Sequence, residues 1–357
     1  MPMWLFLFLK LTLLVSPVPS SIGALANDLL TIKAHESFII IREPRIIDEA
    51  RAHHLTGQSF IGPAPLEPTV LKVLPVAADK KDRWPRGRAE TTLKPALTAR
   101  SAYVMDKDSG AVFYQKEAET ARPIASLTKL LSAVVFLNQN PDFNKTVVIT
   151  EEDGLQGRLY LEVGEEIKAK DLFFTSLTGS SNNATMALAR STGLGLAKFV
   201  EQMNEQARHW GLKKTTVVEP TGLNPTNQST AREIAYLLKN VLDLLLVRQA
   251  TTLKNYFFRA EKTGWEHQVQ ATDELLSDSL ISSKIKKING GKTGFIDEAG
   301  FNFAVEVEDE DGHQIIVVVL GADSHWSRFS EAKDLAEWVF SNFLWPDQEG
   351  FAALPAP

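Results

Sequence analysis

The chain has 357 residues, a formal net charge of −6, 44% hydrophobic residues and no cysteine. The acidic balance argues against a nucleic-acid partner, because no excess of basic residues is present to neutralise phosphates. The lack of cysteine excludes disulfides, thiolate metal sites and a cysteine nucleophile, and the seven histidines contain no H-x-x-x-H pair beside an acid. We therefore expect no metal and no cofactor, in a globular chain long enough for one large domain or two.

The first 26 residues have the pattern of a secretory signal peptide. MWLFLFLKLTLLVSPVPSSIGALA is an apolar run interrupted by Lys10, followed by proline and serine residues and by Ala24-x-Ala26, small residues that suit cleavage after Ala26. No lysine or arginine precedes the apolar run, so an uncleaved membrane anchor is the alternative. Both interpretations predict an extracytoplasmic protein, in the periplasm or on the outer face of the cytoplasmic membrane, with membrane association only through this N-terminus.

Residues 27–95 are predicted to form a Pro-rich extension or linker. SFIIIREPRII could form a short strand, but GPAPLEPTVLKVLPV and DKKDRWPRGRAE are rich in proline and charge, as linkers are. A small packed subdomain is the alternative interpretation of this stretch.

From residue 96 onward, strands are predicted near both ends of the segment and helices between them. SAYVMD and AVFYQK flank a turn at residues 107–110 and predict one β-hairpin. FNFAVEVE and QIIVVVLGA flank Asp311-Gly312 and predict a second. A short strand is expected at residues 146–150, and apolar spacing predicts helices at 126–138, 169–179, 183–191, 195–212, 230–245 and 330–344.

This order predicts an α+β domain at residues 96–344, followed by a tail at residues 345–357. The two hairpins come from opposite ends of the domain, so we expect one antiparallel sheet flanked by terminal helices, with an inserted helical lobe. A cleft between the sheet and the lobe is where we expect a functional site.

Ser126 and Lys129 stand at the start of the first predicted helix. A lysine that is desolvated beside a serine has a lowered pKa and can accept the serine proton, and a helix N-terminus suits a developing oxyanion. The spacing alone is weak, because about one or two Ser-x-x-Lys pairs are expected by chance in a chain of this length. The chain also holds Ser283/Lys286 and Ser330/Lys333. The alternative is a serine that only caps the helix, with its lysine in water.

Two further polar groups suit such a site. Lys292-Thr293-Gly294 has glycines on both sides of the lysine, which allow close approach of a substrate backbone, and its side chains can bind a carboxylate. The same triplet at residues 262–264 lies between two strand-like runs and is interpreted as an exposed hairpin tip. Ser180-Ser181-Asn182-Asn183 joins two apolar helices, where helix capping is the alternative.

The order Ser-x-x-Lys, Ser-x-Asn and Lys-Thr-Gly is typical of penicillin-binding proteins and class A β-lactamases. The surrounding segments PIASLTKLLSAVVFL, TSLTGSSNNATMALA, VEPTGLNPTNQSTAREIA and GGKTGFIDEAGFNFAVEV extend the similarity. From about residue 96 to residue 344 the chain resembles the D-alanyl-D-alanine carboxypeptidases of the serine peptidase S11 type. The resemblance implies a β-lactamase/DD-peptidase-like fold.

Carried over by position, the resemblance implies a role for each motif residue. Ser126 would be the acylated nucleophile and Lys129 its base. Ser180 would relay a proton to the leaving amine and Asn182 would hold the substrate amide, with Ser181 and Asn183 as a shifted alternative. The substrate-binding set would be Lys292 and Thr293 for the terminal carboxylate, Gly294 of the same triplet, Phe295 as an oxyanion donor together with the Ser126 N–H, and Arg328 near the carboxylate. For Arg328 an ordinary surface arginine is the alternative.

The function that the resemblance implies is a serine-type D-Ala-D-Ala carboxypeptidase. It would act on peptidoglycan stem peptides through an acyl-enzyme on Ser126, with β-lactam antibiotics as covalent inhibitors. A DD-endopeptidase that cuts peptidoglycan cross-links is the alternative. A β-lactamase is a further one, because Glu219–Asn224 (EPTGLN) is distantly similar to the acidic loop of those enzymes. A non-catalytic wall-binding module is the third alternative.

Overall fold

A computed structural model describes residues 30–34, 37–41, 84–88, 92, 94–154, 157, 160–277 and 283–351, the first two ranges by their backbone alone. The predicted signal peptide, and most of the predicted linker, lie outside these residues. The chain divides into two compact units, residues 1–72 and 73–357. In the first unit, β1 (Leu30–Ala34) pairs antiparallel with β2 (Ser37–Ile41), which begins where SFIII predicts a strand.

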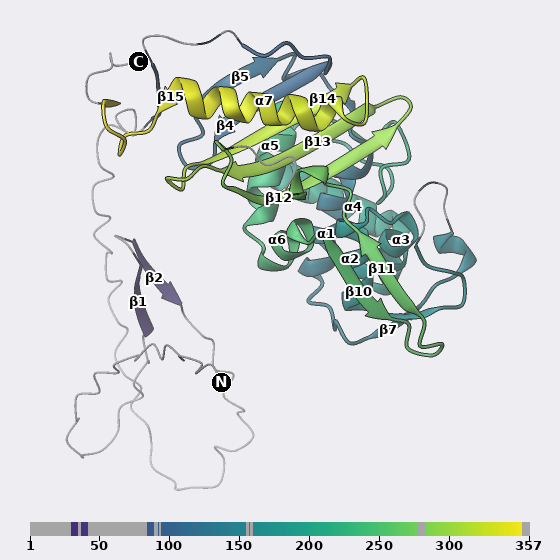
Figure 1. Ribbon diagram of the computed structural model, residues 1–357. Helices are drawn as coiled ribbons and strands as arrows, with labels where there is room; N and C mark the ends of the chain where they lie inside the picture. The colour runs from purple at the N-terminus through teal and green to yellow at the C-terminus, as the bar shows by residue number, and fades with distance from the viewer. Residues whose placement is uncertain are drawn as a thin grey trace, which may run out of the picture. The chain divides into compact units, whose positions relative to one another are not determined.

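The second unit is built on a five-stranded antiparallel sheet with the order β12–β13–β14–β4–β5 (Figure 1). Its strands are β4 (Ser101–Asp106), β5 (Val112–Lys116), β12 (Lys287–Ile296), β13 (Gly300–Glu308) and β14 (Gln314–Ala322). The C-terminal hairpin joins the N-terminal one where β14 pairs with β4. The prediction of a single sheet made from both ends of the domain is therefore confirmed.

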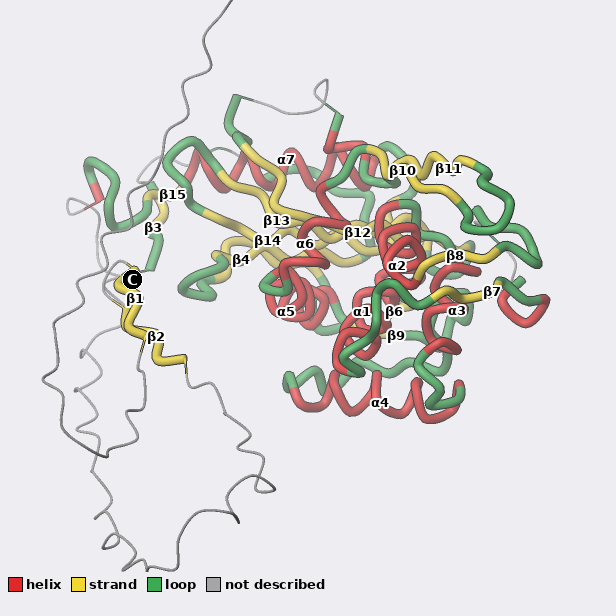
Figure 2. The backbone as a smooth tube through the Cα atoms, turned by 90° about the horizontal axis from the view of Figure 1, so that it is seen from below, coloured by secondary structure: helices red, strands yellow, loops and turns green. Residues whose placement is uncertain are grey.

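Helices cover both faces of this sheet, as Figure 2 shows. Helix α7 lies on one face, while α5 packs on the opposite face together with the helical lobe. The helices are α1 (Lys129–Asn138), α2 (Ala169–Thr178), α3 (Asn182–Ser191), α4 (Leu196–His209), α5 (Ala231–Leu242), α6 (Leu245–Thr252) and α7 (Ser327–Asn342).

The sheet separates two hydrophobic cores because side chains alternate along each strand. In β14, Ile316 and Val318 belong to the core shared with the lobe, while Val317 and Val319 belong to the core under α7. All four are fully buried, which explains why this strand is a continuous apolar run.

Short antiparallel two-stranded ribbons accompany the helices of the lobe. They are β6 (Arg122–Pro123) with β9 (Gln228–Ser229), β7 (Thr146–Val148) with β8 (Glu166–Lys168), and β10 (Asn255–Arg259) with β11 (Glu266–Gln270). The tip of the β10–β11 ribbon carries the second Lys-Thr-Gly triplet, which is exposed as predicted.

Segments of this unit that lie outside the predicted domain of residues 96–344 also pack against that domain. The short β3 (Arg86–Gly87) pairs with β15 (Phe343–Leu344), and the Thr92 N–H donates to Asn342 Oδ1 over 2.6 Å. Trp345 is buried and donates through Nε1 to Asp106 Oδ1 over 2.7 Å. Among the described residues, no helix has the length and apolar character that a membrane span requires.

Candidate active site

Ser126 lies on a tight turn and not in the α-helix itself. The prediction placed the helix start at Ser126, but residues Ala125–Thr128 form a single 3₁₀ turn and α1 begins at Lys129. Ala125 has a φ of +47°, a left-handed conformation that costs energy for a residue with a Cβ. The half-buried Ser126 hydroxyl thereby projects into the cleft.

Two glycines allow this turn to be held by close backbone contacts. A Cβ on Gly222, whose φ is +89°, would overlap the carbonyl oxygen of Ala125. A Cβ on Gly294 would lie 2.8 Å from the Ile124 carbonyl oxygen and 3.1 Å from the Ser126 nitrogen. Gly294 therefore packs against the serine turn, which explains the need for glycine at this position of the Lys-Thr-Gly triplet.

Lys129 contacts three oxygen atoms inside the protein. Its Nζ donates to Asn182 Oδ1 over 2.7 Å and to the Thr221 carbonyl oxygen over 2.6 Å, and it lies 2.9 Å from Ser126 Oγ. An amide oxygen and a carbonyl oxygen can only accept hydrogen bonds, whereas a serine hydroxyl can also donate. An ammonium group donates to all three oxygens, whereas a neutral amine, with two hydrogens and one lone pair, donates to the amide and carbonyl oxygens and can accept a hydrogen bond from the Ser126 hydroxyl.

The environment of Lys129 lowers the pKa of its amine. The side chain is fully buried, and this desolvation lowers the pKa from 10.5 to about 7, although the negative charge of Glu219 acts in the opposite direction. The amine is therefore available as a base near neutral pH, as a serine nucleophile requires.

Glu219 organises the loop that supplies one of these oxygens. Its Oε2 accepts from the Thr221 N–H and hydroxyl over 2.6 Å, and its Oε1 accepts from the Gly222 N–H over 2.6 Å. Oε1 also accepts from the side chain of Asn227 over 2.9 Å, and the Asn227 carbonyl accepts from Ile124 N–H. The loop is thus tied at once to Lys129 and to the serine turn.

The junction between α2 and α3 distinguishes the two possible positions of the Ser-x-Asn motif. Ser180 Oγ accepts from Lys292 Nζ over 2.7 Å, and Asn182 reaches Lys129. Ser181 instead caps α3 by accepting from the Ala184 N–H, and Asn183 donates to the Leu161 carbonyl oxygen. Ser180 has a φ of +58°, a strained conformation that places its hydroxyl on the cleft side.

The edge strand β12 forms the opposite wall of a cleft of about 390 Å³. Lys292 is 1% exposed, and its Nζ donates to Ser180 Oγ within the protein. Thr293 lines the cleft and donates through Oγ1 to Thr272 Oγ1 over 2.6 Å. Ser126, Ser180, Asn182 and Thr293 thus share one cleft between the sheet and the lobe.

Phe295 and Arg328 also line this cleft. The Phe295 side chain is 47% exposed and stacks on Phe301, with 4.3 Å between the ring centroids. Arg328 is 5% exposed, lies over the rings of Phe301 and Phe329, and lines the cleft. It comes from the first turn of α7 and is not an ordinary surface arginine.

The repeated motifs lie outside this cleft. Ser283 and Lys286 are exposed in the turn before β12, and Ser330 is exposed on α7. Lys262 is 73% exposed and lies 3.6 Å from Glu166. These copies supply matched controls, because they share the sequence pattern but not the surroundings.

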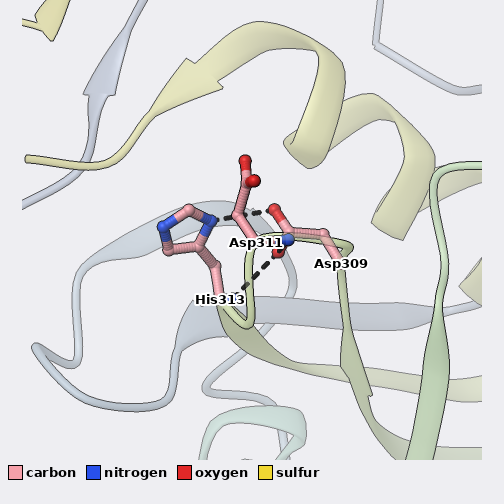
Figure 3. A group of neighbouring side chains, drawn as sticks. All are labelled: Asp309, Asp311 and His313. Atoms are coloured by element: carbon pink, nitrogen blue, oxygen red, sulfur yellow. Dashed lines mark hydrogen bonds and ion pairs between the residues drawn. The ribbon is translucent and has the colours of Figure 1, made fainter. Parts of the chain in front are cut away.

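One group in the described part of the chain has the composition of a metal site, and Figure 3 draws it: Asp309, Asp311 and His313. His313 Nδ1 lies 2.9 Å from Asp309 Oδ2, and its Nε2 lies 2.9 Å from Asp347 Oδ1. Burial lowers the pKa of His313, but hydrogen bonds to these two carboxylates outweigh it and hold the pKa above its usual value. Through these two contacts His313 links the turn between β13 and β14 to Asp347 of the C-terminal segment.

Several site residues carry no sequence signature. Thr221 contributes a backbone carbonyl, which any residue type possesses. Asn302 donates to the Pro123 carbonyl and accepts from the Gly321 N–H, and it thereby ties the sheet to the serine turn. Thr272 faces Thr293 from a segment just after β11. Only the fold brings these groups to the motifs.

Comparisons with known proteins find one group of similar peptidases. The sequence model of the D-alanyl-D-alanine carboxypeptidase family, Peptidase S11, matches residues 88–324. A D-alanyl-D-alanine endopeptidase of Pseudomonas aeruginosa is 32% identical over 71% of this chain and 81% of its own length. The D-alanyl-D-alanine carboxypeptidase DacA of Haemophilus influenzae is 29% identical over 70% of this chain and 63% of its own length.

The fold is similar to that of solved penicillin-binding proteins. Penicillin-binding protein D2 of Listeria monocytogenes, in its cefotaxime-bound form, aligns with a TM-score of 0.60 and 27% identity. The alignment covers 69% of this chain and 99% of that one. The predicted α+β, DD-peptidase-like fold is therefore confirmed.

Proposed function

Because the chain belongs to the D-alanyl-D-alanine carboxypeptidase family, we propose that it hydrolyses D-Ala-D-Ala ends of peptidoglycan stem peptides through an acyl-enzyme on Ser126. The protein is a hydrolase of this family. The observation that carries the proposal is the buried Lys129 amine, 2.9 Å from Ser126 Oγ and with its other hydrogen bonds directed at pure acceptors. That arrangement suits deprotonation of a serine hydroxyl.

The first half of the reaction forms an ester on Ser126. Ser126 Oγ attacks the carbonyl carbon that precedes the last D-Ala, and its proton passes to the neutral Lys129 amine. The backbone N–H groups of Ser126 and Phe295 stabilise the oxyanion of the tetrahedral intermediate. The contact of Gly294 with the serine turn supports this pairing, because it brings β12 next to the Ser126 nitrogen.

The leaving D-Ala needs a proton on its amine and an anchor for its carboxylate. Ser180 donates its hydroxyl proton to the amine, and Lys292, 2.7 Å from Ser180 Oγ, stabilises the oxygen that remains. The Thr293 hydroxyl, Lys292 and Arg328 hold the carboxylate by charge-assisted hydrogen bonds. Asn182 holds the substrate amide. The proton that Lys129 took from Ser126 then passes to the Ser180 oxygen, which restores the Ser180 hydroxyl and the neutral Lys129 amine. Water next attacks the Ser126 ester while Lys129 takes its proton, and that proton returns to Ser126 Oγ as the shortened peptide leaves.

Acylation is expected to accelerate as the pH rises through about 7, because only the neutral Lys129 amine accepts the Ser126 proton. The first-order rate constant for acylation at saturating fluorescent penicillin, measured from pH 5 to pH 9, checks this, because it does not include the binding step. Lys286→Met, which alters an exposed lysine in the same sequence pattern, should leave the profile unchanged. A rate that stays flat across this range would contradict the assignment of Lys129 as the base.

A DD-endopeptidase is the second candidate, and the similarity to the Pseudomonas enzyme over 81% of its length favours it. Two substrates separate the candidates: a synthetic stem peptide ending in D-Ala-D-Ala and a purified cross-linked muropeptide dimer. We expect release of free D-Ala from the first. Cleavage of the dimer alone would assign the endopeptidase activity, and cleavage of neither would refute the proposed function.

The geometry of Glu219 argues against a β-lactamase. Both oxygens of its carboxylate accept hydrogen bonds from the surrounding loop, so neither is set up to activate a deacylating water. A penicillin adduct on Ser126 should therefore be long-lived in intact-mass spectra. A non-catalytic wall-binding module would instead bind stem peptides without turnover.

We place the enzyme outside the cytoplasm, where its proposed substrate is found. The signal-like pattern of residues 1–26 supports this location. Association with the membrane through the N-terminus remains part of the proposal.

A further inference from the structure

Asp273 is a carboxyl group buried behind the cleft wall that we assign to the substrate carboxylate. It follows β11 and is only 7% exposed, while its neighbours Thr272 and Glu274 both line the cleft. Its Oδ1 accepts from the Leu275 N–H over 2.9 Å and caps the short turn Glu274–Leu276. This contact fixes the orientation of the carboxyl group.

The second oxygen of Asp273 points at β12. Among the described residues, Oδ2 has no hydrogen-bond partner. A Cβ on Gly291 would lie only 3.0 Å from it, so this oxygen lies close to the backbone directly before Lys292. A buried carboxylate oxygen without a partner is costly, and such groups call for an explanation.

The charged groups around Asp273 belong mainly to the substrate carboxylate site. In the described part of the chain, Arg328 of α7 and Lys292 of β12 act on it as cations, and Glu274 of its own turn acts as an anion. His325 lies 3.8 Å from Glu274 and 3.0 Å from the Arg328 guanidinium. Asp273 thus faces the same two cations that the substrate carboxylate would use.

We propose that Asp273 is a positioning residue for substrate binding that sets how much of the charge of Lys292 and Arg328 is available to the substrate. When its carboxyl group is neutral, both cations attract the substrate carboxylate. When it is ionised, its negative charge competes with that carboxylate for the two cations. The proposal rests on the proposed function, in which Lys292 and Arg328 bind the leaving carboxylate.

Asp273 ionises in the same pH range in which Lys129 loses its proton. Burial raises the pKa of Asp273 from 3.8 to about 7, although the Leu275 N–H and the charges of Arg328 and Lys292 lower it. As the pH rises through about 7, Asp273 ionises and the KM for a carboxylate substrate should increase. In the same range, loss of the Lys129 proton should increase kcat.

The test compares wild type with Asp273→Asn on two substrates, a stem peptide that ends in D-Ala-D-Ala and the same peptide with a C-terminal amide. Asparagine keeps the Oδ1 cap and imitates the neutral carboxyl group. For the acid peptide, we expect the wild-type KM to rise about tenfold between pH 6 and pH 8.5, and the variant KM to stay flat. For the amide, the two proteins should show the same KM at every pH. The kcat profile should be unchanged.

Three comparisons make the outcome decisive. Asp334→Asn alters a carboxyl group of α7 whose pKa burial also raises, and it should keep the wild-type KM profile. Asp273→Ser retains a capping oxygen, and it is assayed in place of Asp273→Asn if the asparagine variant does not fold. The penicillin adduct on Ser126 reports the proposed function separately. If the adduct forms and KM rises equally in wild type and in Asp273→Asn, the role proposed for Asp273 is wrong while the proposed function stands.

Discussion

Ser126→Ala is expected to eliminate the penicillin adduct and to lower D-Ala release by about 10⁵-fold or more, because no other group replaces the nucleophile. Ser126 Oγ is the atom that contacts the Lys129 amine and is exposed to the cleft. Intact-mass spectra after incubation with penicillin measure the first effect, and release of D-Ala from a stem peptide measures the second.

The variant should fold as well as wild type. The free energy of unfolding should change by no more than about 1 kcal/mol, since the substitution removes one hydroxyl whose only described partner is Lys129. Ser283→Ala is the matched control, because it alters an exposed serine in the same Ser-x-x-Lys pattern. An adduct that persists in Ser126→Ala would show that another residue is acylated.

Lys129→Met is expected to lower the rate of Ser126 acylation by about 10³-fold, because methionine fills much of the same space but cannot accept a proton. Ser126, Ser180 and Lys292 remain in place, so the loss should appear in the acylation rate more than in the affinity for the peptide. Stopped-flow acylation by a fluorescent penicillin and the KM of the stem peptide distinguish the two effects. Lys286→Met should behave as wild type.

Lys129→Met should also differ from wild type in how its free energy of unfolding depends on pH. The Lys129 amine has a pKa of about 7 in the folded protein and about 10.5 in the unfolded chain. Between these values the unfolded chain binds more protons, so the stability of wild type rises with pH from about 7 to 10.5 and is flat below 7. Lys129→Met lacks this contribution, which amounts to a few kcal/mol. The measurement is the free energy of unfolding in urea at pH 6.5 and at pH 9.5. Relative to Lys129→Met, wild type should be more stable at pH 9.5 than it is at pH 6.5.

The sheet could be predicted from the sequence because its signals are local. FNFAVEVE has an alternating apolar pattern and QIIVVVLGA a continuous one, both typical of strands, with Asp311-Gly312 as a turn between them. Both strands and the predicted turn are present, and the buried strand joins the two hairpins. The helix start at Ser126 was wrong by three residues, because contacts with Gly222 and Gly294 hold the serine in a separate turn.

The site was only partly accessible to sequence reasoning. The order of motifs named Ser126, Lys129 and Lys292, but it left Ser180 and Ser181 as alternatives. The left-handed backbone at Ser180 directs its hydroxyl to Lys292, and no composition or spacing predicts that angle. Thr221, Thr272 and Asp273 had no motif at all, because they act through a carbonyl, a neighbouring hydroxyl and a buried charge.

The sequence by itself determined the secondary-structure order, the fold class and the family, because periodicity, turn residues and motif order are properties of neighbouring residues. The tertiary structure alone decided that Ser180, and not Ser181, contacts Lys292, since that depends on segments far apart in the chain. It also decided the direction in which the pKa values of Lys129 and Asp273 shift. A pKa follows from desolvation and nearby charge, and both arise only when the lobe closes on the sheet.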